Sequence, residues 1–494
     1  MSDIKLRNYQ QRTVDLILEQ LQKGTKKQLI NSPTGSGKTV IASELVRILV
    51  EQGKKVFFVV ANEPLVMQTY NKFTQIGLRP SIIKSKMEKY YNPLLPVQIV
   101  MMQSYSARVD KLPDLNPSII IVDEIDHGYK GQMIKKLFEK HSEAQIVGLT
   151  GTPCTFDGYL LPDFDFYHEV ITVRKLQRLG FLSMDRNYVP LTPDLSGVRI
   201  KSTGDFNEED LDEVCNKNYI INDIVNTYKK IDIGNKGICF AISIEHGEKL
   251  RDAFLDAGIK CGLVHSKLKK FQNDYWLDSF KSGRIQILVN IGKLTRGFDS
   301  VDIFDVIMCR PTLSLALYCQ SVGRGARPDT LGKNEFRVID YAGNINTFGL
   351  WSEPRLYSID SKPKAEYEHK IIVCPNCFSV IYERTGNKCP ECDFLIKAQQ
   401  EKREREIKET ERVEQVVEIK ALTGSAGAIE SLTKLLGYNA NTFYYTKVLP
   451  VRVASVDLDV FNSEVIRLAN YCRRKSYKPY YVVVKIREKM EVKI

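Results

Sequence analysis

The 494-residue sequence has no apolar run that approaches the roughly 18 residues needed to cross a bilayer. Its first ten residues, MSDIKLRNYQ, also lack the apolar segment of a secretory signal. These absences predict a protein that is neither secreted nor integral to a membrane, so we expect a cytoplasmic location. The chain is not depleted of apolar residues either, because 43% of it is hydrophobic, and wholesale disorder is therefore excluded.

A strong charge of one sign is also missing. Lys and Arg number 71 against 60 Asp and Glu, and the resulting net charge of +11 suits a polyanionic partner but is common in ordinary basic proteins. The distribution is more informative, because residues 440–494 hold 11 Lys and Arg against 5 Asp and Glu. More than half of the excess positive charge therefore lies in that segment.

Short apolar runs recur along the chain and are separated by helical stretches. Continuous Val and Ile runs are typical of parallel strands, because both faces of such a sheet are covered. The first series lies at residues 28–33, 55–62, 98–104, 118–124 and 145–151, and the second at 237–243, 261–266, 286–292, 304–310 and 336–341. The pattern predicts an α/β protein with two lobes in tandem.

The remaining segments complete the predicted domain organisation. We expect a first lobe at 1–155, a connecting, mostly helical segment at 156–235, and a second lobe at 236–345. A segment with paired cysteines at 346–398, a charged helix at 399–420 and a basic, Tyr-rich domain at 421–494 follow. A length of 494 residues exceeds what one core usually supports, which agrees with several domains.

The sequence SPTGSGKT follows the first predicted strand and precedes a predicted helix. Such a loop turns backbone N–H groups toward a phosphate chain, Lys38 reaches the terminal phosphates, and Thr39 is a ligand for Mg²⁺. Ser32 replaces the usual first glycine, so a coincidental Gly-rich turn is the alternative, although the strand and helix context disfavours it. The predicted nucleotide-binding residues of this loop are Pro33, Thr34, Gly35, Ser36, Gly37, Lys38 and Thr39.

Two acidic residues, Asp123 and Glu124, end the most hydrophobic strand of the first lobe. Ligands of an open parallel sheet gather at the carboxyl ends of its strands. Asp123 is therefore a candidate to hold Mg²⁺, and Glu124 to orient or deprotonate the attacking water. Without the upstream loop, an ordinary solvated turn would be the better interpretation.

In QSVGRGAR, Arg324 and Arg327 are three residues apart, with Gln320 one turn earlier, so we expect the three on one helical face. Guanidinium groups presented across a cleft stabilise charge on a transferring phosphoryl group. A plain basic helix face is the alternative.

The order of these and other motifs strongly resembles that of a superfamily 2 helicase. The resemblance covers roughly residues 4–345 and rests on LRNYQ (6–10), SPTGSGKT (32–39), VVANEPLVMQ (59–68), DEID (123–126), TGTP (150–153), GICFAIS (237–243), LTRGFD (294–299) and QSVGRGAR (320–327). It implies two RecA-like lobes and an ATP-hydrolysing nucleic-acid motor.

The resemblance also implies roles for individual residues. Arg7, Tyr9 and Gln10 would hold the adenine of ATP, although an ordinary polar helix start is the alternative. Gly297 and Asp299 belong to the motif that contacts ATP and the nucleic-acid strand. The motif with Thr150 and Thr152 couples hydrolysis to lobe movement, and the arginines at 324 and 327 take the arginine-finger role.

Nucleic acid lying across both lobes would be gripped through its phosphates near Asn62, Pro64, Ser243 and Thr295. Such contacts are largely independent of base sequence. ATP stabilises the closed pair of lobes, and loss of the γ-phosphate removes that differential contact. Each cycle of ATP binding and hydrolysis can then shift the nucleic-acid contacts of one lobe relative to those of the other.

Two CxxC pairs, Cys374 with Cys377 and Cys389 with Cys392, are separated by eleven residues. Four thiolates at this spacing predict a tetrahedral Zn²⁺ site, a zinc ribbon. Disulfides fit an intracellular chain poorly, and redox CxxC motifs do not normally occur twice at hairpin spacing. A closed four-sulfur site predicts a structural role, and the loop between the pairs is about equally suited to touching nucleic acid or to being a scaffold.

The basic end of the chain combines Tyr rings with positive charge. Arg473, Arg474, Lys475 and Tyr480 are the candidates for nucleic-acid contact, because rings stack on bases while Lys and Arg contact phosphates. A small α/β domain with half-buried tyrosines is the alternative.

The whole pattern favours an ATP-dependent DNA helicase or translocase that acts on forked, branched or recombination-intermediate DNA in a bacterial or phage-infected cell. The motifs look like those of RadD-type helicases and of phage branch-migration helicases of the UvsW type. DNA is favoured over RNA because DEID departs from the DEAD box of RNA helicases. The alternatives are a duplex translocase or protein remodeller without strand separation, and an ATP-switched DNA-binding or annealing protein. Single-strand-binding or recombination proteins are the expected protein partners.

Overall fold

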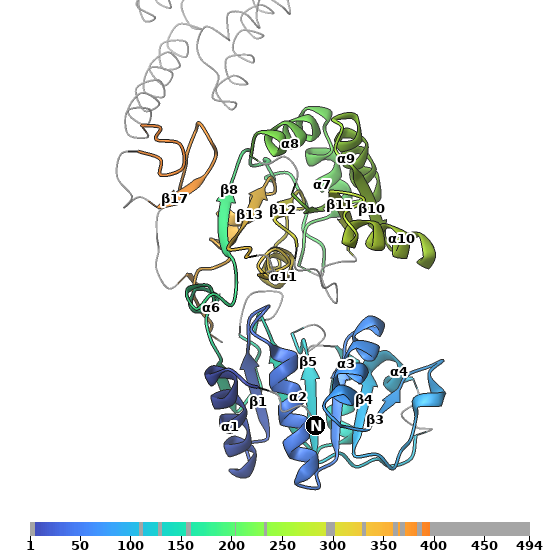
Figure 1. Ribbon diagram of the computed structural model, residues 1–494. Coiled ribbons are helices and arrows are strands. Elements are labelled where there is room, and N and C mark those ends of the chain that lie inside the picture. Colours follow the sequence, from blue (N-terminus) through green and yellow to red (C-terminus); the bar gives the residue numbers. More distant parts are fainter. Residues whose placement is uncertain are drawn as a thin grey trace, which may run out of the picture. The chain divides into compact units, whose positions relative to one another are not determined.

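The computed structural model describes residues 5–107, 112–126, 131–154, 160–202, 204–231, 235–292, 302–328, 332–358, 364–365, 371–382 and 388–395. Within these ranges the chain forms two large parallel sheets, each flanked by helices (Figure 1). We call the part with the first sheet the first lobe and the part with the second sheet the second lobe.

The first sheet has the order β3-β4-β2-β5-β6-β1-β7 among the described residues, and its paired strands are parallel. Its strands are β1 (Lys27–Asn31), β2 (Val56–Val60), β3 (Pro80–Ile83), β4 (Val97–Met101), β5 (Ile119–Asp123), β6 (Gln145–Thr150) and β7 (Phe166–Glu169). The helices of this part are α1 (Asn8–Gln22), α2 (Lys38–Glu51), α3 (Glu63–Gln75), the 3₁₀ helix η1 (Glu88–Tyr90), α4 (Met102–Ser106) and α5 (Gln132–Lys140). Because β6 separates β1 from β5, the loops after β1 and β5 lie two strands apart at one edge.

The second sheet has the order β10-β11-β9-β12-β13-β8 in the described part of the chain and is also parallel. Its strands are β8 (Met184–Tyr188), β9 (Gly237–Phe240), β10 (Cys261–His265), β11 (Ile287–Ile291), β12 (Asp305–Met308) and β13 (Glu335–Asp340). The helices that precede or cover it are α6 (Val173–Arg178), α7 (Glu208–Cys215), α8 (Asn218–Ile231), α9 (Ile244–Asp256), α10 (Lys270–Lys281), α11 (Leu315–Val322) and α12 (Asn344–Phe348).

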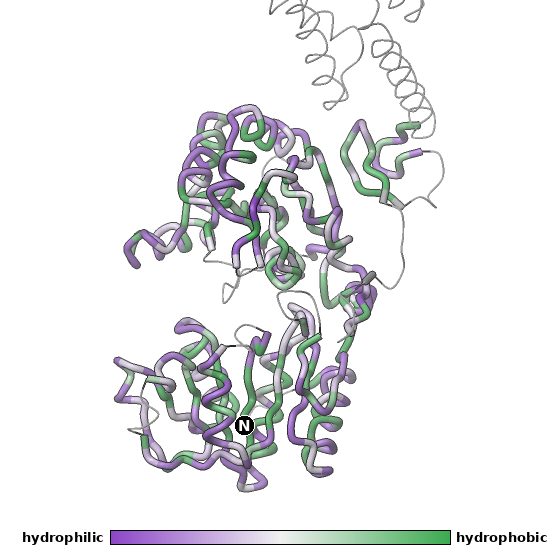
Figure 2. The backbone as a smooth tube through the Cα atoms, turned by 180° about the vertical axis from the view of Figure 1, so that it is seen from behind, coloured by the Kyte–Doolittle hydropathy of each residue, from purple (hydrophilic) through white to green (hydrophobic). Residues whose placement is uncertain are grey.

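Each large sheet is buried on both faces. Neighbouring residues of β1, Leu29 and Ile30, belong to two different hydrophobic clusters, as do Val306 and Ile307 of β12. Successive side chains of a strand point to opposite faces, so a core on each side requires a continuous apolar run. Figure 2 shows such hydrophobic stretches of chain inside both lobes. The predicted α/β fold with two parallel-sheet lobes is thus confirmed.

The segment 156–235 contains two strands in addition to the helices that the sequence suggests. It contains α6, α7 and α8, but also β7 and β8, which add an edge strand to the first and the second sheet. Burial alternates along β7, and only one residue of β8 is fully buried. An edge strand with an exposed face has no continuous apolar run, which explains why the hydrophobic pattern does not reveal it.

Two small antiparallel pairs follow the second sheet. They are β14 (Arg355–Leu356) with β15 (Lys364–Ala365), and β16 (Ile371–Val373) with β17 (Val380–Tyr382). Among the described helices, none is long and apolar enough to span a membrane. The predicted charged helix at 399–420 and the Tyr-rich domain at 421–494 lie outside the described residues.

Candidate ATP and zinc sites

The phosphate loop connects β1 to α2, as the sequence predicts. Gly35 and Gly37 have φ angles of +83° and +87°, which favour glycine, and α2 begins directly at Lys38. Inside the loop, the Ser32 and Ser36 hydroxyls lie 2.6 Å apart, and Ser36 donates to the Pro33 carbonyl at 2.6 Å. These short bonds hold the turn ahead of a helix N-terminus, the place where backbone N–H groups receive a phosphate.

Lys38 and Glu124 form an ion pair at the mouth of this loop, with 2.7 Å between Nζ and Oε1. Both side chains are mostly buried, at 13% and 18% exposure. Burial acts to lower the pKa of Lys38, but the carboxylates of Glu124 and Asp123 outweigh it, so the pKa is raised and the ammonium stays charged. The structure thus brings together the lysine and the carboxylate that the sequence assigns to the same chemistry.

Asp123, the last residue of β5, sits beside this pair. Burial, followed by the neighbouring Glu124 charge, raises its pKa to about 7. A crowded, desolvated carboxylate of this kind is stabilised by a divalent cation, and oxygen donors such as Asp123 and the Thr39 hydroxyl suit Mg²⁺; their binding of that ion stays a prediction. Glu124 itself has a φ of +53°, so its backbone is held in a conformation that is uncommon outside glycine.

The acidic motif is connected to the TGTP segment by a direct hydrogen bond. The Thr150 hydroxyl donates to Asp126 Oδ1 at 2.6 Å, and Thr150 Oγ1 accepts from the Thr152 backbone N–H at 3.0 Å. Both threonines are buried. A shift of the acidic segment would therefore also move the TGTP segment, which is the kind of coupling that the resemblance implies.

The candidate adenine residues lie at the start of α1, against the phosphate loop. The Tyr9 hydroxyl and Gln10 Nε2 both donate to the Ser36 carbonyl, at 2.7 and 3.0 Å. Gln10 Oε1 accepts from the Arg7 backbone N–H at 2.9 Å. Gln10 is also buried, whereas Arg7 is exposed, and contact of these residues with adenine stays a prediction.

Phe181 joins this group and was not among the candidates. The Arg7 guanidinium lies 3.6 Å from the centre of the Phe181 ring, and the Tyr9 and Phe181 rings are 6.2 Å apart. A planar cation over an aromatic face is a favourable stack. The sequence signal was weak, because Phe181 lies in the connecting segment, far from any recognised motif.

The arginines of QSVGRGAR do not share a helical face. α11 ends at Val322, so Gln320 is on the helix, whereas Arg324 lies in the turn that follows it and Arg327 in the irregular segment after that turn. The turn that follows the helix is tightly packed, because a Cβ at Gly325 would lie 2.4 Å from the Phe336 ring and 2.8 Å from Val306. The expectation of one helical face is wrong, because both arginines lie beyond the end of the helix.

Two of the candidate nucleic-acid residues are helix caps at equivalent places in the lobes. Asn62 follows β2 and accepts from Leu65 N–H, and Ser243 follows β9 and accepts from His246 N–H. Pro64 is exposed in the first turn of α3. Contact of these residues with nucleic acid stays a prediction.

Several other candidates fall on parts of the chain that the structure does not describe. They are Thr295, Gly297, Asp299, Arg473, Arg474, Lys475 and Tyr480.

The four paired cysteines form one cluster. The Sγ atoms of Cys374, Cys377, Cys389 and Cys392 all lie within 4.8 Å of one another. Cys374 and Cys392 have their sulfurs 3.7 Å apart, close to the ~3.8 Å edge of a tetrahedron with Zn–S bonds of ~2.3 Å. The donor set therefore fits Zn²⁺ and leaves no place for a fifth ligand, as a structural site requires.

We expect one zinc ion per chain in carefully purified protein, measured by elemental analysis. Replacing Cys374 and Cys389 together with Ser should remove it, because two hydroxyls do not substitute for two thiolates. Replacing the isolated Cys215 and Cys261 with Ser is the matched control and should leave the zinc content unchanged. Wild-type protein without metal would contradict the zinc assignment.

A phosphate loop after β1 and an acidic pair after β5, in a chain with two parallel-sheet lobes, define the class of two-lobed nucleotide hydrolases. Comparison with known families agrees. The family described as "Type III restriction enzyme, res subunit" matches residues 3–155, and "Helicase conserved C-terminal domain" matches residues 216–329.

Individual relatives extend the similarity across most of the chain. A "51.5 kDa protein" of a Lactococcus phage is 30% identical over 386 residues, covering 76% of this chain and 80% of the relative. The Saccharomyces cerevisiae protein named "Putative ATP-dependent helicase IRC3" is 29% identical over 381 residues, 72% of this chain but only 54% of that protein.

A solved structure shares the fold. It is titled "The fragment structure of a putative HsdR subunit of a type I restriction enzyme from Vibrio vulnificus YJ016", with a TM-score of 0.54 and 20% identity over 76% of this chain and 70% of that chain. The chain belongs to the superfamily 2 helicases, and it is an ATP-hydrolysing enzyme of that superfamily.

Proposed function

We propose that this helicase is a DNA motor that acts on forked, branched or recombination-intermediate DNA. The observation that carries the proposal is the 2.7 Å Lys38–Glu124 pair beside the half-buried Asp123, because it places the lysine and both carboxylates of the hydrolytic set at one sheet edge. The family then indicates what the hydrolysis drives.

Each residue of this set has a distinct task. Lys38 exchanges its contact with Glu124 for the terminal phosphates of ATP, which releases the Glu124 carboxylate to orient water. Thr39 and Asp123 would hold Mg²⁺, which would neutralise phosphate charge. Arg324 and Arg327 stabilise the charge that develops on the transferred phosphoryl group. A nucleotide that contacts groups of both lobes favours their closure, and its hydrolysis favours their opening.

DNA is favoured over RNA as the substrate for two reasons. The acidic motif reads DEID rather than DEAD, and the first lobe matches a family described by a restriction enzyme subunit. Asn62 and Ser243, which cap helices after β2 and β9, are equivalent points for gripping a phosphate backbone.

The alternatives differ in what ATP hydrolysis accomplishes. A duplex translocase or protein remodeller would use the same site without separating strands. A DNA-binding or annealing protein switched by ATP would not need Glu124 and two arginines in addition to Lys38. The full set therefore favours a motor over a switch.

We further propose a role in repair, recombination or branch migration, with single-strand-binding or recombination proteins as partners. The phage relative supports work in the cytoplasm of a bacterial or phage-infected cell. Zn²⁺ held by the four-cysteine cluster would stabilise the ribbon.

ATPase stimulation by different nucleic acids tests the proposal. We expect forked and four-way DNA to raise the turnover number at least about tenfold over the basal rate, more than single-stranded or duplex DNA of equal length, with RNA weakest. The measurement is steady-state phosphate release at fixed salt, because binding to phosphates is strongly salt-dependent. Equal stimulation by RNA and DNA would contradict the DNA assignment, and stimulation by duplex without unwinding of forks would favour the translocase.

A further inference from the structure

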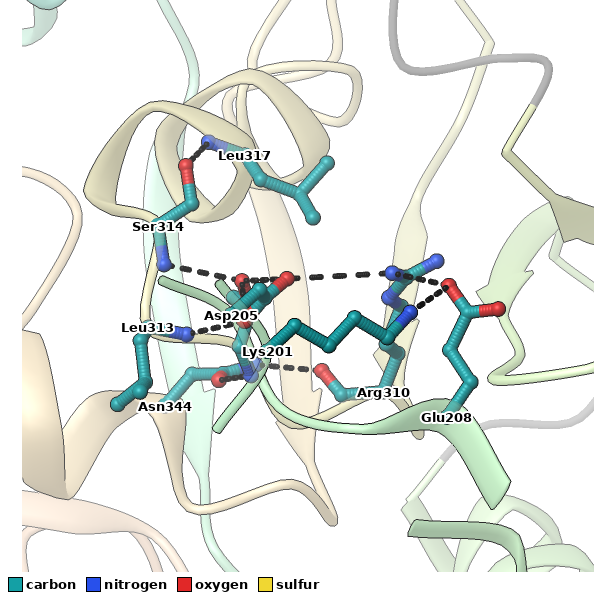
Figure 3. Close-up of polar contacts among 9 residues, drawn as sticks. Lys201, Asp205, Glu208, Arg310, Leu313, Ser314, Leu317 and Asn344 are labelled. Carbon is teal, nitrogen blue, oxygen red and sulfur yellow. Dashed lines mark hydrogen bonds and ion pairs between the residues drawn. The ribbon is translucent and has the colours of Figure 1, made fainter. Parts of the chain in front are cut away.

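The loop that leads into α11 is hydrogen-bonded to a segment that is not part of the alternating strands and helices of the second lobe. This loop, residues 310–314, enters the helix that ends just before Arg324. The segment that holds it, residues 199–202 and 204–210, follows β8 in the sequence and includes the start of α7. Figure 3 shows the polar contacts between the two.

Asp205 is the centre of these contacts. Its Oδ1 accepts from the Leu313 backbone N–H at 2.8 Å, and its two oxygens accept from the Thr312 hydroxyl at 3.1 Å each. Thr312 Oγ1 in turn accepts from the Ser314 backbone N–H at 3.0 Å. Ser314 is the N-cap of α11 and accepts from Leu317 N–H at 3.2 Å (Figure 3). One carboxylate thereby fixes successive residues up to the first turn of the helix.

Asn344 supports the same loop from the opposite direction. It accepts from the Thr312 backbone N–H and donates to the Arg310 carbonyl, both at 3.1 Å. Asn344 and Thr312 are buried, with 1% and 2% exposure. The loop is therefore held by its backbone on two sides, and a loop held in this way has one conformation rather than several.

Charged residues tie the segment to Arg310. Glu208 accepts from Arg310 at 3.1 Å, Lys201 lies 3.7 Å from Glu208, and Asp205 lies 3.9 Å from Arg310. The side chains of Asp205 and Arg310 are only 16% and 21% exposed. Apolar contacts add to these bonds, because Leu211 and Cys215 of α7 pack with Ile242 of the second lobe.

The position of α11 decides where the arginines lie. The helix is eight residues long, about 12 Å at ~1.5 Å per residue, and it joins the loop held by Asp205 to the turn with Arg324. A small rotation at its first turn is carried to its other end, because a hydrogen-bonded helix moves as a rigid rod. Charge stabilisation in a transition state depends on donors that are already in place.

We propose that Asp205 is a positioning residue for the arginine turn, acting through the Thr312 hydroxyl and the entry of α11. The inference rests on the proposed role of Arg324 and Arg327 in ATP hydrolysis. Asp205 itself does not touch the reacting groups. Its function is to keep the two guanidinium groups preorganised, so that its loss affects turnover more than ATP binding.

The first experiment measures ATP hydrolysis by the full-length Asp205→Ala protein at saturating DNA. We expect the turnover number to fall about tenfold while the KM for ATP changes less than about twofold, since misplacement of a charged group by less than 1 Å is costly. Asp205→Asn should recover most of the rate, because an amide oxygen still accepts from Thr312 and Leu313. The matched control is Asp256→Ala, which makes the same substitution at an exposed aspartate of α9 and should leave the turnover number unchanged.

A triple variant separates positioning from a general loss of structure. In an Arg324→Ala, Arg327→Ala background, Asp205→Ala should cause almost no further loss, because the groups that it positions are gone. Thr312→Val, with thermal unfolding followed by circular dichroism, should reproduce the Asp205→Ala rate if the protein remains folded. The proposal would be overturned if Asp205→Ala lowered the turnover number of the Arg324→Ala, Arg327→Ala protein by the same factor as that of the parent protein. An unchanged turnover number in the Asp205→Ala single variant would also overturn it. Normal hydrolysis by the arginine variant would instead overturn the proposed role of Arg324 and Arg327.

Discussion

Replacing Glu124 with Gln should lower the ATP turnover number by roughly a thousandfold, within the range of about 10²- to 10⁴-fold for loss of a positioned base. ATP should still bind, because the substitution leaves the phosphate loop and Lys38 intact and removes a negative charge beside the phosphates. The measurement combines single-turnover hydrolysis with binding of a fluorescent ATP analogue. The variant should therefore accumulate in its nucleotide-bound state.

Lys38→Ala is the informative contrast to this variant. It also abolishes turnover, but it should raise the dissociation constant for ATP by at least about tenfold, because a buried cation that faces the phosphates is lost. Glu139→Gln, which changes an exposed glutamate of α5, controls for the loss of charge in the first lobe. Normal turnover in Glu124→Gln would show that Glu124 is not the residue that orients the attacking water.

Arg324→Ala and Arg327→Ala should each reduce the DNA-stimulated turnover number by roughly a thousandfold, the lower end of the range for arginine fingers. ATP affinity should change much less, since the contribution of these residues grows with the charge of the transition state. The comparison of turnover number with KM for each variant measures this difference.

Lysine substitutions sharpen the test of the arginine turn. Arg324→Lys retains the charge but not the planar, bidentate group, so we expect only partial recovery. Arg284→Ala, in an exposed part of the second lobe, should hydrolyse ATP like the parent protein. Full DNA-stimulated activity in both arginine-to-alanine variants would show that the hydrolytic site is confined to the first lobe.

Local sequence predicts the strands that build both cores and the loops that end them. All ten predicted apolar runs overlap strands of the two large sheets, because burial on both faces leaves a continuous signal. The Lys38–Glu124 contact also follows from sequence, since the loops after β1 and β5 must open at the same edge of a parallel sheet. These features are therefore predicted by the hydrophobic pattern of the sequence together with the parallel order of the strands.

The features that sequence did not reveal depend on contacts between distant residues. Phe181 is identified only by its approach to Arg7, and Asp205 only by its bonds to residues more than 100 positions away. The tight turn after α11 packs Gly325 against Phe336 and Val306, which other strands supply. In each case the interaction that decides the structure joins residues too far apart in the sequence for hydrophobic periodicity or helix propensity to reveal it.

The pairing of β7 and β8 with different sheets has a mechanical consequence. Residues 170–183 alone separate these strands, and six of the fourteen form α6. With ~3.4 Å for each extended residue and ~1.5 Å for each helical one, this stretch reaches at most about 36 Å. A tether of that length keeps the lobes at an effective mutual concentration in the millimolar range, so their closure is a unimolecular event whose rate does not depend on protein concentration. Lengthening the tether with a Gly/Ser insert at exposed Gly180 would lower the effective concentration of one lobe near the other. Closure would then be slower, although no residue of the phosphate loop is altered.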